Sequence, residues 1–252
     1  MDAMYGFSYL VPRVCWMTFL ILMLVWICKT QNGFAYTNTK MGSQGYLNHH
    51  YIFMTVAWPI CMFEAILSYR VPLYRMPDRY AHKYLHVALQ TAAGVFILLG
   101  LIFVGLFKRY NGEYQFWSVH SWLGAIAIAM YIAQYIAGFW AYLVSRWSPE
   151  RKAAFYSVHR FLGSANLLTA FTAIAAGLAE VQTFDIFAKK GIKGFYTDYS
   201  YSLISIVLPI MTLMVLIQAL VVVYNLMHGQ QAIPVSSSVS SAKATNGVRT
   251  SV

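Results

Sequence analysis

The residues of this sequence best placed to do chemistry belong to a short phrase that occurs twice. The phrase reads WSVHSWLG at its first occurrence and YSVHRFLG at its second, and each copy opens a long apolar run. The histidines, His120 and His159, are costly to place in an apolar helix unless they bind something. The glycine four residues later, Gly124 or Gly163, lies on nearly the same helix face as its histidine. It leaves room beside the imidazole for a flat, wide group.

Two further histidines stand in matching positions. His50 begins the second apolar run and His86 begins the third, as His120 and His159 begin the fourth and fifth. Successive membrane spans run in opposite directions, so His50 lies at the depth of His120, and His86 at the depth of His159. His49 points about 100° away from its neighbour, so only one of the two can face a bundle. The sequence therefore predicts two histidine pairs, one near each membrane face.

A fifth histidine, His82, shares a helix face with His86, since the two are four residues apart. Such a pair can bind a metal by itself. His82, however, lies among Arg79 and Lys83 at the expected membrane surface. We predict a solvated histidine there and not a ligand.

The pairs indicate which metal group would bind. Two imidazoles without a carboxylate or thiolate nearby do not complete a tetrahedral zinc site. They do complete a haem iron, whose porphyrin supplies the other four nitrogens, and helical bundles build such sites from facing side chains. With both axial positions taken by protein, the iron transfers electrons instead of activating oxygen. Two such groups near opposite faces would form an electron path across a membrane.

The elements that position these histidines are expected to be membrane helices. The chain is 59% hydrophobic and only 10% charged, against about 25% charged in soluble domains. Four stretches lack Asp, Glu, Lys and Arg and reach the roughly 18 residues of a membrane span: 84–107, 120–145, 161–179 and 199–227. Residues 50–69 form another span with one acid, Glu64, and residues 14–28 extend back to Ala3 if Arg13 snorkels to the surface. We predict an all-α membrane protein with six spans.

The basic residues indicate orientation. Six spans put both termini on one side, which carries eleven Lys and Arg residues against seven on the other. This bias favours cytosolic termini. The net charge of +10 is spread over loops on both faces, which does not resemble a nucleic-acid-binding patch. We expect a transmembrane domain over residues 1–228 and a disordered cytosolic tail over 229–252, where Ser, Ala and Gly dominate.

From about His50 to Glu180 the chain resembles the cytochrome b561 family of transmembrane ascorbate-dependent oxidoreductases. The resemblance rests on the four spaced histidines, on EAILSYR at residues 64–70, on SVHSWLG, and on Gln134 within YIAQYIAGF. The histidine spacing is similar to that of the duodenal ferric reductase type. The resemblance implies that helices two to five form a four-helix bundle around two haem b groups. It also implies that cytosolic ascorbate donates an electron, and that a ferric chelate or monodehydroascorbate accepts it on the other face.

Further residues are expected near the cofactors, where the family has matching ones. Arg70 follows the histidine of its span by 20 residues, about 30 Å along a helix, and so reaches the inner haem, where a cation can neutralise propionates. An ordinary positive-inside anchor is the alternative for Arg70. Glu180 follows its own histidine by 21 residues and reaches the outer level. Trp117 and Ser118, at the head of the first phrase, complete the expected cofactor-binding set.

The substrate sites are expected at the two faces. The inner basic residues resemble the family's ascorbate site: Arg79, Lys83, Arg151 and Lys152. Lys152 stands where relatives commonly have arginine, and a lysine cannot make the two parallel hydrogen bonds by which arginine binds one anion. Contact with lipid headgroups is the alternative reading for Arg151. On the outer face the ferric reductase type carries a histidine for its metal substrate, but here the loop reads FKRYNGE, with Lys108 near that position. Lys108 would attract an anionic chelate or ascorbate.

Two other functions fit parts of the pattern. A metal or solute transporter with histidine ligands would show helices broken by Gly or Pro at the midplane, whereas the only prolines expected inside spans are Pro59 and Pro209. A haem-carrying subunit of a larger redox complex is the second alternative. We expect the chain in the plasma membrane or in an endosomal, lysosomal or vesicle membrane. Its expected partners are ascorbate, the acceptor, lipid and a second copy of the chain.

Overall fold

The structure, a computed structural model, describes residues 3–34, 43–69, 79–198 and 203–228, without the side chains at several helix ends. In that part of the chain the regular elements are all helical. They are α1 (Ala3–Thr30), α2 (Gln44–Thr55), η1 (Val56–Met62), α3 (Phe63–Leu67), α4 (Arg79–Asn111), α5 (Val119–Phe139), η3 (Trp140–Val144), α6 (Pro149–Asp198) and α7 (Leu203–His228). The expected tail over 229–252 lies outside the described residues.

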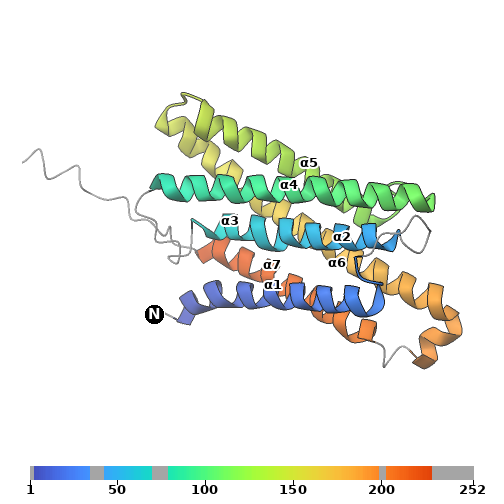
Figure 1. The fold of residues 1–252 in the computed structure, drawn as a ribbon. Coiled ribbons are helices and arrows are strands. Elements are labelled where there is room, and N and C mark those ends of the chain that lie inside the picture. Colours follow the sequence, from blue (N-terminus) through green and yellow to red (C-terminus); the bar gives the residue numbers. More distant parts are fainter. Residues whose placement is uncertain (1–2, 35–42, 70–78, 199–202, 229–252) are drawn as a thin grey trace, which may run out of the picture.

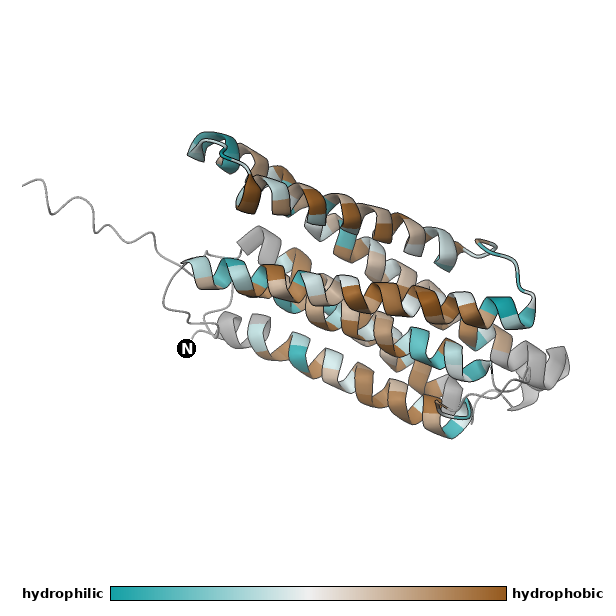
Figure 2. Ribbon diagram, turned by 45° about the horizontal axis from the view of Figure 1, so that its top comes forward, coloured by the Kyte–Doolittle hydropathy of each residue, from teal (hydrophilic) through white to brown (hydrophobic). Residues whose placement is uncertain are grey.

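Among the described residues, six helical stretches are long and apolar enough to cross a membrane. The second span combines α2, η1 and α3, and the fourth combines α5 and η3. Hydrophobic residues run along the helices, and hydrophilic ones gather toward their ends (Figure 2). The predicted all-α protein with six spans is confirmed.

The second span contains a π-helical segment around its proline. Pro59 lies within η1, where the wider turns of the π-helix carry the chain past a residue that cannot donate a backbone hydrogen bond. The span therefore continues as a helix instead of breaking. Pro209 lies inside α7 as expected, and Pro12 adds a third intrahelical proline because α1 begins at Ala3.

Spans two to five form the central bundle, and spans one and six lie along one side of it. The α2–η1–α3 span packs on α4, and α5 packs on α6, while α6 also contacts η1. α1 packs mainly against α7, and the pair lies on the opposite side of α2 from α4 and α5 (Figure 1). Large apolar side chains fill the interior where these layers meet: Phe19, Trp26, Phe63, Leu167 and Met211 are almost completely buried.

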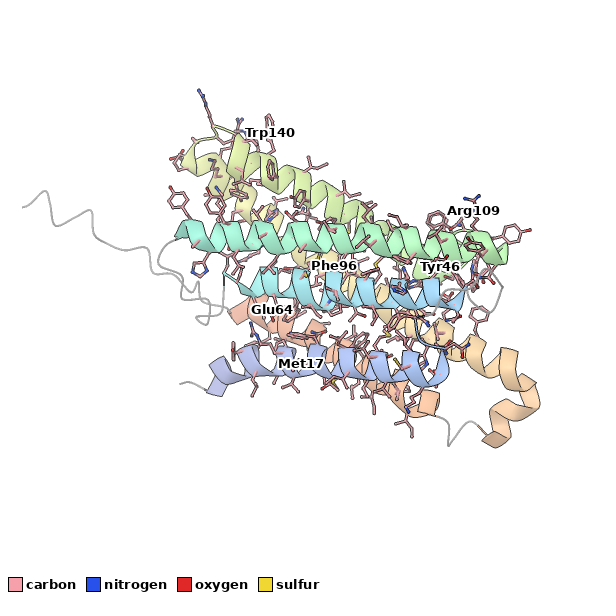
Figure 3. All side chains as sticks on the ribbon, viewed as in Figure 1. Met17, Tyr46, Glu64, Phe96, Arg109 and Trp140 are labelled. Atoms are coloured by element: carbon pink, nitrogen blue, oxygen red, sulfur yellow. The ribbon has the colours of Figure 1, made fainter. Side chains whose placement is uncertain are left out.

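An ion pair ties the first span to the second. Arg13 Nη2 lies 2.5 Å from Glu64 Oε2, and the two side chains are only 15% and 9% exposed. The indole of Trp16 donates to the other carboxylate oxygen at 3.3 Å, and Figure 3 labels Glu64 on the second span, which lies next to α1. The first span was expected to extend back to Ala3 if Arg13 snorkels; the structure instead gives Arg13 a buried acid on the neighbouring helix as its partner.

Candidate metal centres

The first histidine pair joins α2 to α5. The ring centroids of His50 and His120 lie 6.3 Å apart, with ring planes at 88°. His50 Nδ1 donates to the carbonyl of Gly100 at 2.9 Å, and His120 Nδ1 donates to the carbonyl of Ala173 at 2.8 Å. Because a carbonyl can only accept, both rings carry their proton on Nδ1. Each Nε2, on the far side of the ring, keeps a lone pair for a metal.

The second pair joins α4 to α6. The ring centroids of His86 and His159 lie 6.4 Å apart, with ring planes at 72°. His86 Nδ1 donates to the carbonyl of Ala65 at 2.8 Å, and the Ser68 hydroxyl donates to the same oxygen at 2.7 Å. His159 Nδ1 is buried and has no hydrogen-bond partner among the described residues.

The two pairs lie at different depths in the bundle. His120 is in the first turn of α5, and Gly138, which touches the ring of His159, follows 18 residues later. At 1.5 Å per residue the two levels are about 27 Å apart along the helix. Tyr46 and Arg109 mark the end of the bundle nearer the first pair, and Trp140 marks the end nearer the second (Figure 3). The structure thus brings together the pairs that alternation of spans predicts.

Two glycines that the sequence reading overlooked seat the histidines of α5 and α6. A Cβ on Gly177 would lie 2.7 Å from His120 Nδ1, and a Cβ on Gly138 would lie 2.9 Å from His159 Cε1. Each ring therefore rests directly on the backbone of the partner helix. Each glycine also follows the histidine of its own helix by 18 residues. That repeated interval is the signal that could have found them.

The glycines of the repeated phrase behave differently. A Cβ on Gly124 or Gly163 would meet no heavy atom within 4 Å. The space next to each phrase histidine is therefore open on the side where the sequence predicts a flat group.

The donor set and spacing of both pairs fit a haem iron. Two metal–imidazole bonds of about 2 Å, plus about 1 Å from each nitrogen to its ring centroid, separate the centroids by about 6 Å. The observed 6.3 and 6.4 Å agree with that value. In the described part of the chain no three His, Cys, Asp or Glu side chains gather as they would around a bare metal ion. A porphyrin needs only the two imidazoles.

Three residues were expected around the first pair, His50 and His120, which is the predicted outer pair. Ser118 is the N-cap of α5: its hydroxyl oxygen accepts from the backbone N–H of Ser121 at 3.3 Å, which fixes where the helix begins. Trp117 is half exposed and packs edge-on against Phe184 at 5.4 Å. Glu180 lies three residues beyond Gly177 and so within one turn of the level of the outer pair. Their contacts with a cofactor stay predictions.

His82 is not the solvated residue that its neighbours suggest. It is only 3% exposed, and its Nδ1 donates to the carbonyl of Ser68 at 2.8 Å. Ser68 caps the end of α3, where carbonyl groups lack helical partners and accept bonds from other elements. The ring of Tyr69 lies between His82 and His86, with centroids 6.3 and 5.4 Å away. His82 therefore bonds to the end of the second span, next to His86 of the second pair, which is the predicted inner pair.

Two of the expected basic residues, Lys83 and Lys152, contact Tyr142, Lys83 through its ammonium and Lys152 through its backbone carbonyl. Lys83 Nζ donates to the Tyr142 carbonyl at 2.6 Å, and the Tyr142 hydroxyl donates to the Lys152 carbonyl at 3.3 Å. The Tyr142 ring also lies 5.9 Å from that of His159. Through Tyr142, Lys83 and Lys152 lie near His159, and their role in binding ascorbate stays a prediction. Arg151 is exposed, with its guanidinium 5.4 Å from the Trp147 ring.

Two expected basic residues fall outside this description. Arg70 is not among the described residues, and the side chain of Arg79, at the start of α4, is not described either. Their proposed roles therefore rest on the sequence alone.

The profile of the family described as eukaryotic cytochrome b561 matches residues 49–185, more than half of the chain and a stretch that includes both histidine pairs. The chain belongs to the cytochrome b561 family. A cytochrome b carries haem of the b type, so family membership assigns b-type haem to this chain.

Relatives within the family are distant. The chain is 26% identical over 167 residues to the lysosomal membrane ascorbate-dependent ferrireductase CYB561A3 of Homo sapiens, covering 66% of this chain and 67% of that protein. It is 28% identical over 164 residues to the transmembrane ascorbate-dependent reductase CYB561 of Bos taurus, covering 65% and 62%. A putative transmembrane ascorbate-dependent reductase CYB561 homolog of Caenorhabditis elegans is 28% identical over 169 residues, covering 64% and 62%. The chain thus matches about two thirds of the length of these relatives.

At the end of α4, Lys108 bonds to the loop between α4 and α5 of this cytochrome b561. Its ammonium donates to the carbonyl of Tyr114 at 3.2 Å. The loop begins with a left-handed glycine, Gly112, at φ +68°. Lys108 thus lies in the last turn of α4, at the end of the bundle that Arg109 marks (Figure 3), and its role toward an acceptor stays a prediction.

Proposed function

We propose that this cytochrome b561 transfers electrons across its membrane, from ascorbate on the side of the termini to an acceptor on the other face, with two haem b groups. His50 and His120 would hold the outer haem, and His86 and His159 the inner one. A haem iron with two axial imidazoles exchanges single electrons and has no open position for a small molecule. The relatives' names, ascorbate-dependent reductase and ferrireductase, support an oxidoreductase of this kind.

The observation that carries the proposal is the matching geometry of two histidine pairs at opposite ends of one bundle. The ring separations differ by only 0.1 Å, at 6.3 and 6.4 Å. In three of the four rings a backbone carbonyl accepts from Nδ1. Such bonds fix the tautomer, orient the ring and raise its basicity toward a metal. A metal or solute transporter would instead need helices broken at the midplane, whereas the six described spans continue through their prolines.

On the inner face the chain would bind and orient ascorbate. Ascorbate carries one negative charge near neutral pH, and a cluster of cations raises its local concentration. Lys83 and Lys152 lie beside Tyr142 and the inner pair, and Arg79 and Arg151 would extend the cluster. The bond from Lys83 to the Tyr142 carbonyl holds its ammonium at the end of the bundle. We place this face and the termini in the cytosol.

On the outer face Lys108 would attract an anionic acceptor, a ferric chelate or monodehydroascorbate. A protonated lysine is a poor ligand for iron itself, so we favour electrostatic capture over direct coordination. Arg70 would neutralise propionates at the inner level, and Glu180 would lie near the outer haem with Trp117. The membrane would be the plasma membrane or that of an endosome, lysosome or vesicle, and a second copy of the chain is a candidate partner.

The test is the number of haems per chain and its dependence on each pair. We expect two low-spin haems per polypeptide by pyridine haemochrome assay and reduced-minus-oxidised spectra. His50→Ala should remove the outer haem, and His86→Ala the inner one. His49→Ala is the matched control: its ring stacks on Phe103 at 4.8 Å, so both haems should remain. Folded, haem-supplied protein that binds no haem would refute the proposal.

A further inference from the structure

The inner pair contains one histidine whose anchoring differs from that of the other three. This inference rests on the proposed function and concerns how the inner haem is held. His120 touches Gly177 and donates to the carbonyl of Ala173, four residues before that glycine. His159 touches Gly138 in the reciprocal way, so the equivalent residue on α5 is Gln134, four residues before Gly138. Helical spacing puts Gln134 and Gly138 on one face of α5.

His159 and Gln134 each have a buried polar atom without a hydrogen-bond partner among the described residues. These atoms are His159 Nδ1 and the side-chain oxygen of Gln134. One is a donor and the other an acceptor, because a ring that offers Nε2 to a metal carries its proton on Nδ1. Buried polar groups in native proteins are nearly always paired. These two groups are complementary and occupy equivalent positions of one helix pair, so each is a candidate partner for the other.

The orientation of the ring explains why the backbone does not take this bond. A Cβ built on Gly177 has His120 Nδ1 as its nearest atom, at 2.7 Å. A Cβ built on Gly138 instead has His159 Cε1 nearest, at 2.9 Å, with Nδ1 farther off at 3.4 Å. The His159 ring is therefore placed differently on its glycine, with Nδ1 less close to the backbone. A side chain from the same face can reach that nitrogen.

We propose that Gln134 is the positioning residue of His159: its amide oxygen accepts the Nδ1–H bond when the imidazole holds the inner haem. The bond would orient the ring and raise its basicity, which favours ferric iron. The other three histidines donate to backbone carbonyls, which substitution of the accepting residue leaves in place. Residue 134 is thus where a side chain sets the reduction potential of one haem and not of the other.

The test is a redox titration of the full-length protein with Gln134→Leu and Gln134→Glu, combined with electron paramagnetic resonance of the ferric haems. Gln134→Leu should raise the midpoint potential of the component that His159→Ala removes. Loss of one such partner changes metal-site equilibria about tenfold, which for one electron is about 59 mV. Gln134→Glu keeps an oxygen acceptor and should stay at or below the wild-type potential. The outer component should not move in either variant.

A neighbouring variant controls for general disturbance of α5. Tyr135→Phe removes the hydroxyl that bonds Thr91 at 2.8 Å and should leave both potentials unchanged. Two bound haems with an unshifted inner component in Gln134→Leu would overturn this inference and leave the proposed function standing. Equal shifts of both components would also overturn it, since they would report altered packing. Absence of haem from the folded wild-type protein would instead remove the proposed function.

Discussion

Adding one methyl group at Gly177 should disturb the outer haem while sparing the fold. A Cβ there would lie 2.7 Å from His120 Nδ1, so the ring must retreat by about 0.7 Å to reach ordinary contact at 3.4 Å. In the haem-free protein that movement is easy, because the imidazole is the end of a side chain. Alanine even favours a helix over glycine by about 1 kcal/mol. The apoprotein should therefore be as stable as wild type or slightly more so.

The haem-bound protein does not have that freedom. The ring makes a 2.8 Å bond to the carbonyl of Ala173 through Nδ1, and in the haem-bound protein its Nε2 would be held by the iron. Metal–ligand distances tolerate only about 0.2 Å of error, well below the displacement required. We expect haem affinity at the outer site to fall roughly 10- to 100-fold, as for loss of an outer-shell contact, or about 1.4–2.8 kcal/mol.

The assay is haem titration of Gly177→Ala apoprotein, with thermal unfolding measured in parallel. Gly105→Ala is the matched control, because a Cβ at Gly105 meets no atom within 4 Å; it should bind two haems with wild-type affinity. Gly138→Ala should instead weaken the inner site. If Gly177→Ala binds two haems as tightly as wild type, His120 does not hold a metal in the position described.

Two further predictions concern charges. Lys83→Ala with Lys152→Ala should slow reduction by ascorbate severalfold without loss of haem, while Lys108→Glu should slow reoxidation by ferric citrate instead; stopped-flow absorbance in oriented proteoliposomes separates the half-reactions. Both effects should shrink as salt rises, because screening limits their reach to about 10 Å at 0.1 M, and an inner-side rate unchanged in the double variant would contradict the assignment. Arg13→Met removes the cation that pairs with the buried Glu64, which should destabilise the fold by about 3–5 kcal/mol. Adding Glu64→Gln should restore most of that loss, and an unchanged unfolding temperature for Arg13→Met alone would argue against the ion pair.

The sequence was enough to predict the six spans and to pair the histidines by depth. Long apolar runs indicate membrane helices. Because successive helices run in opposite directions, their order along the chain shows which helix ends lie at the same depth. That reasoning matched His50 with His120 without any knowledge of side-chain contacts. Helix geometry showed only that one of His49 and His50 can face the bundle; in the structure His50 does, and the ring of His49 packs against Phe34 and Phe103.

Contacts that depend on a particular neighbour could not be predicted in this way. Arg13 was expected at the surface because nothing in its own span shows that Glu64 faces it from the next one. His82 was expected in water because its sequence neighbours are basic, whereas its partner is a carbonyl at the end of another helix. Gly138 and Gly177 act on rings from a different helix. Such contacts depend on how neighbouring helices are shifted and rotated relative to one another, which hydrophobic periodicity does not determine.

The reciprocal seating of α5 and α6 has a consequence for where such a protein can work. Each of these helices carries a histidine for one centre and, 18 residues later, the glycine that seats the histidine of the other. The distance between the two histidine pairs is therefore set by an interval of 18 residues along a single helix. Membranes of different organelles differ by several ångströms in thickness, and helices adapt by tilting. Tilting moves the whole helix as one body, so the distance between the two histidine pairs would stay the same from one membrane to the next.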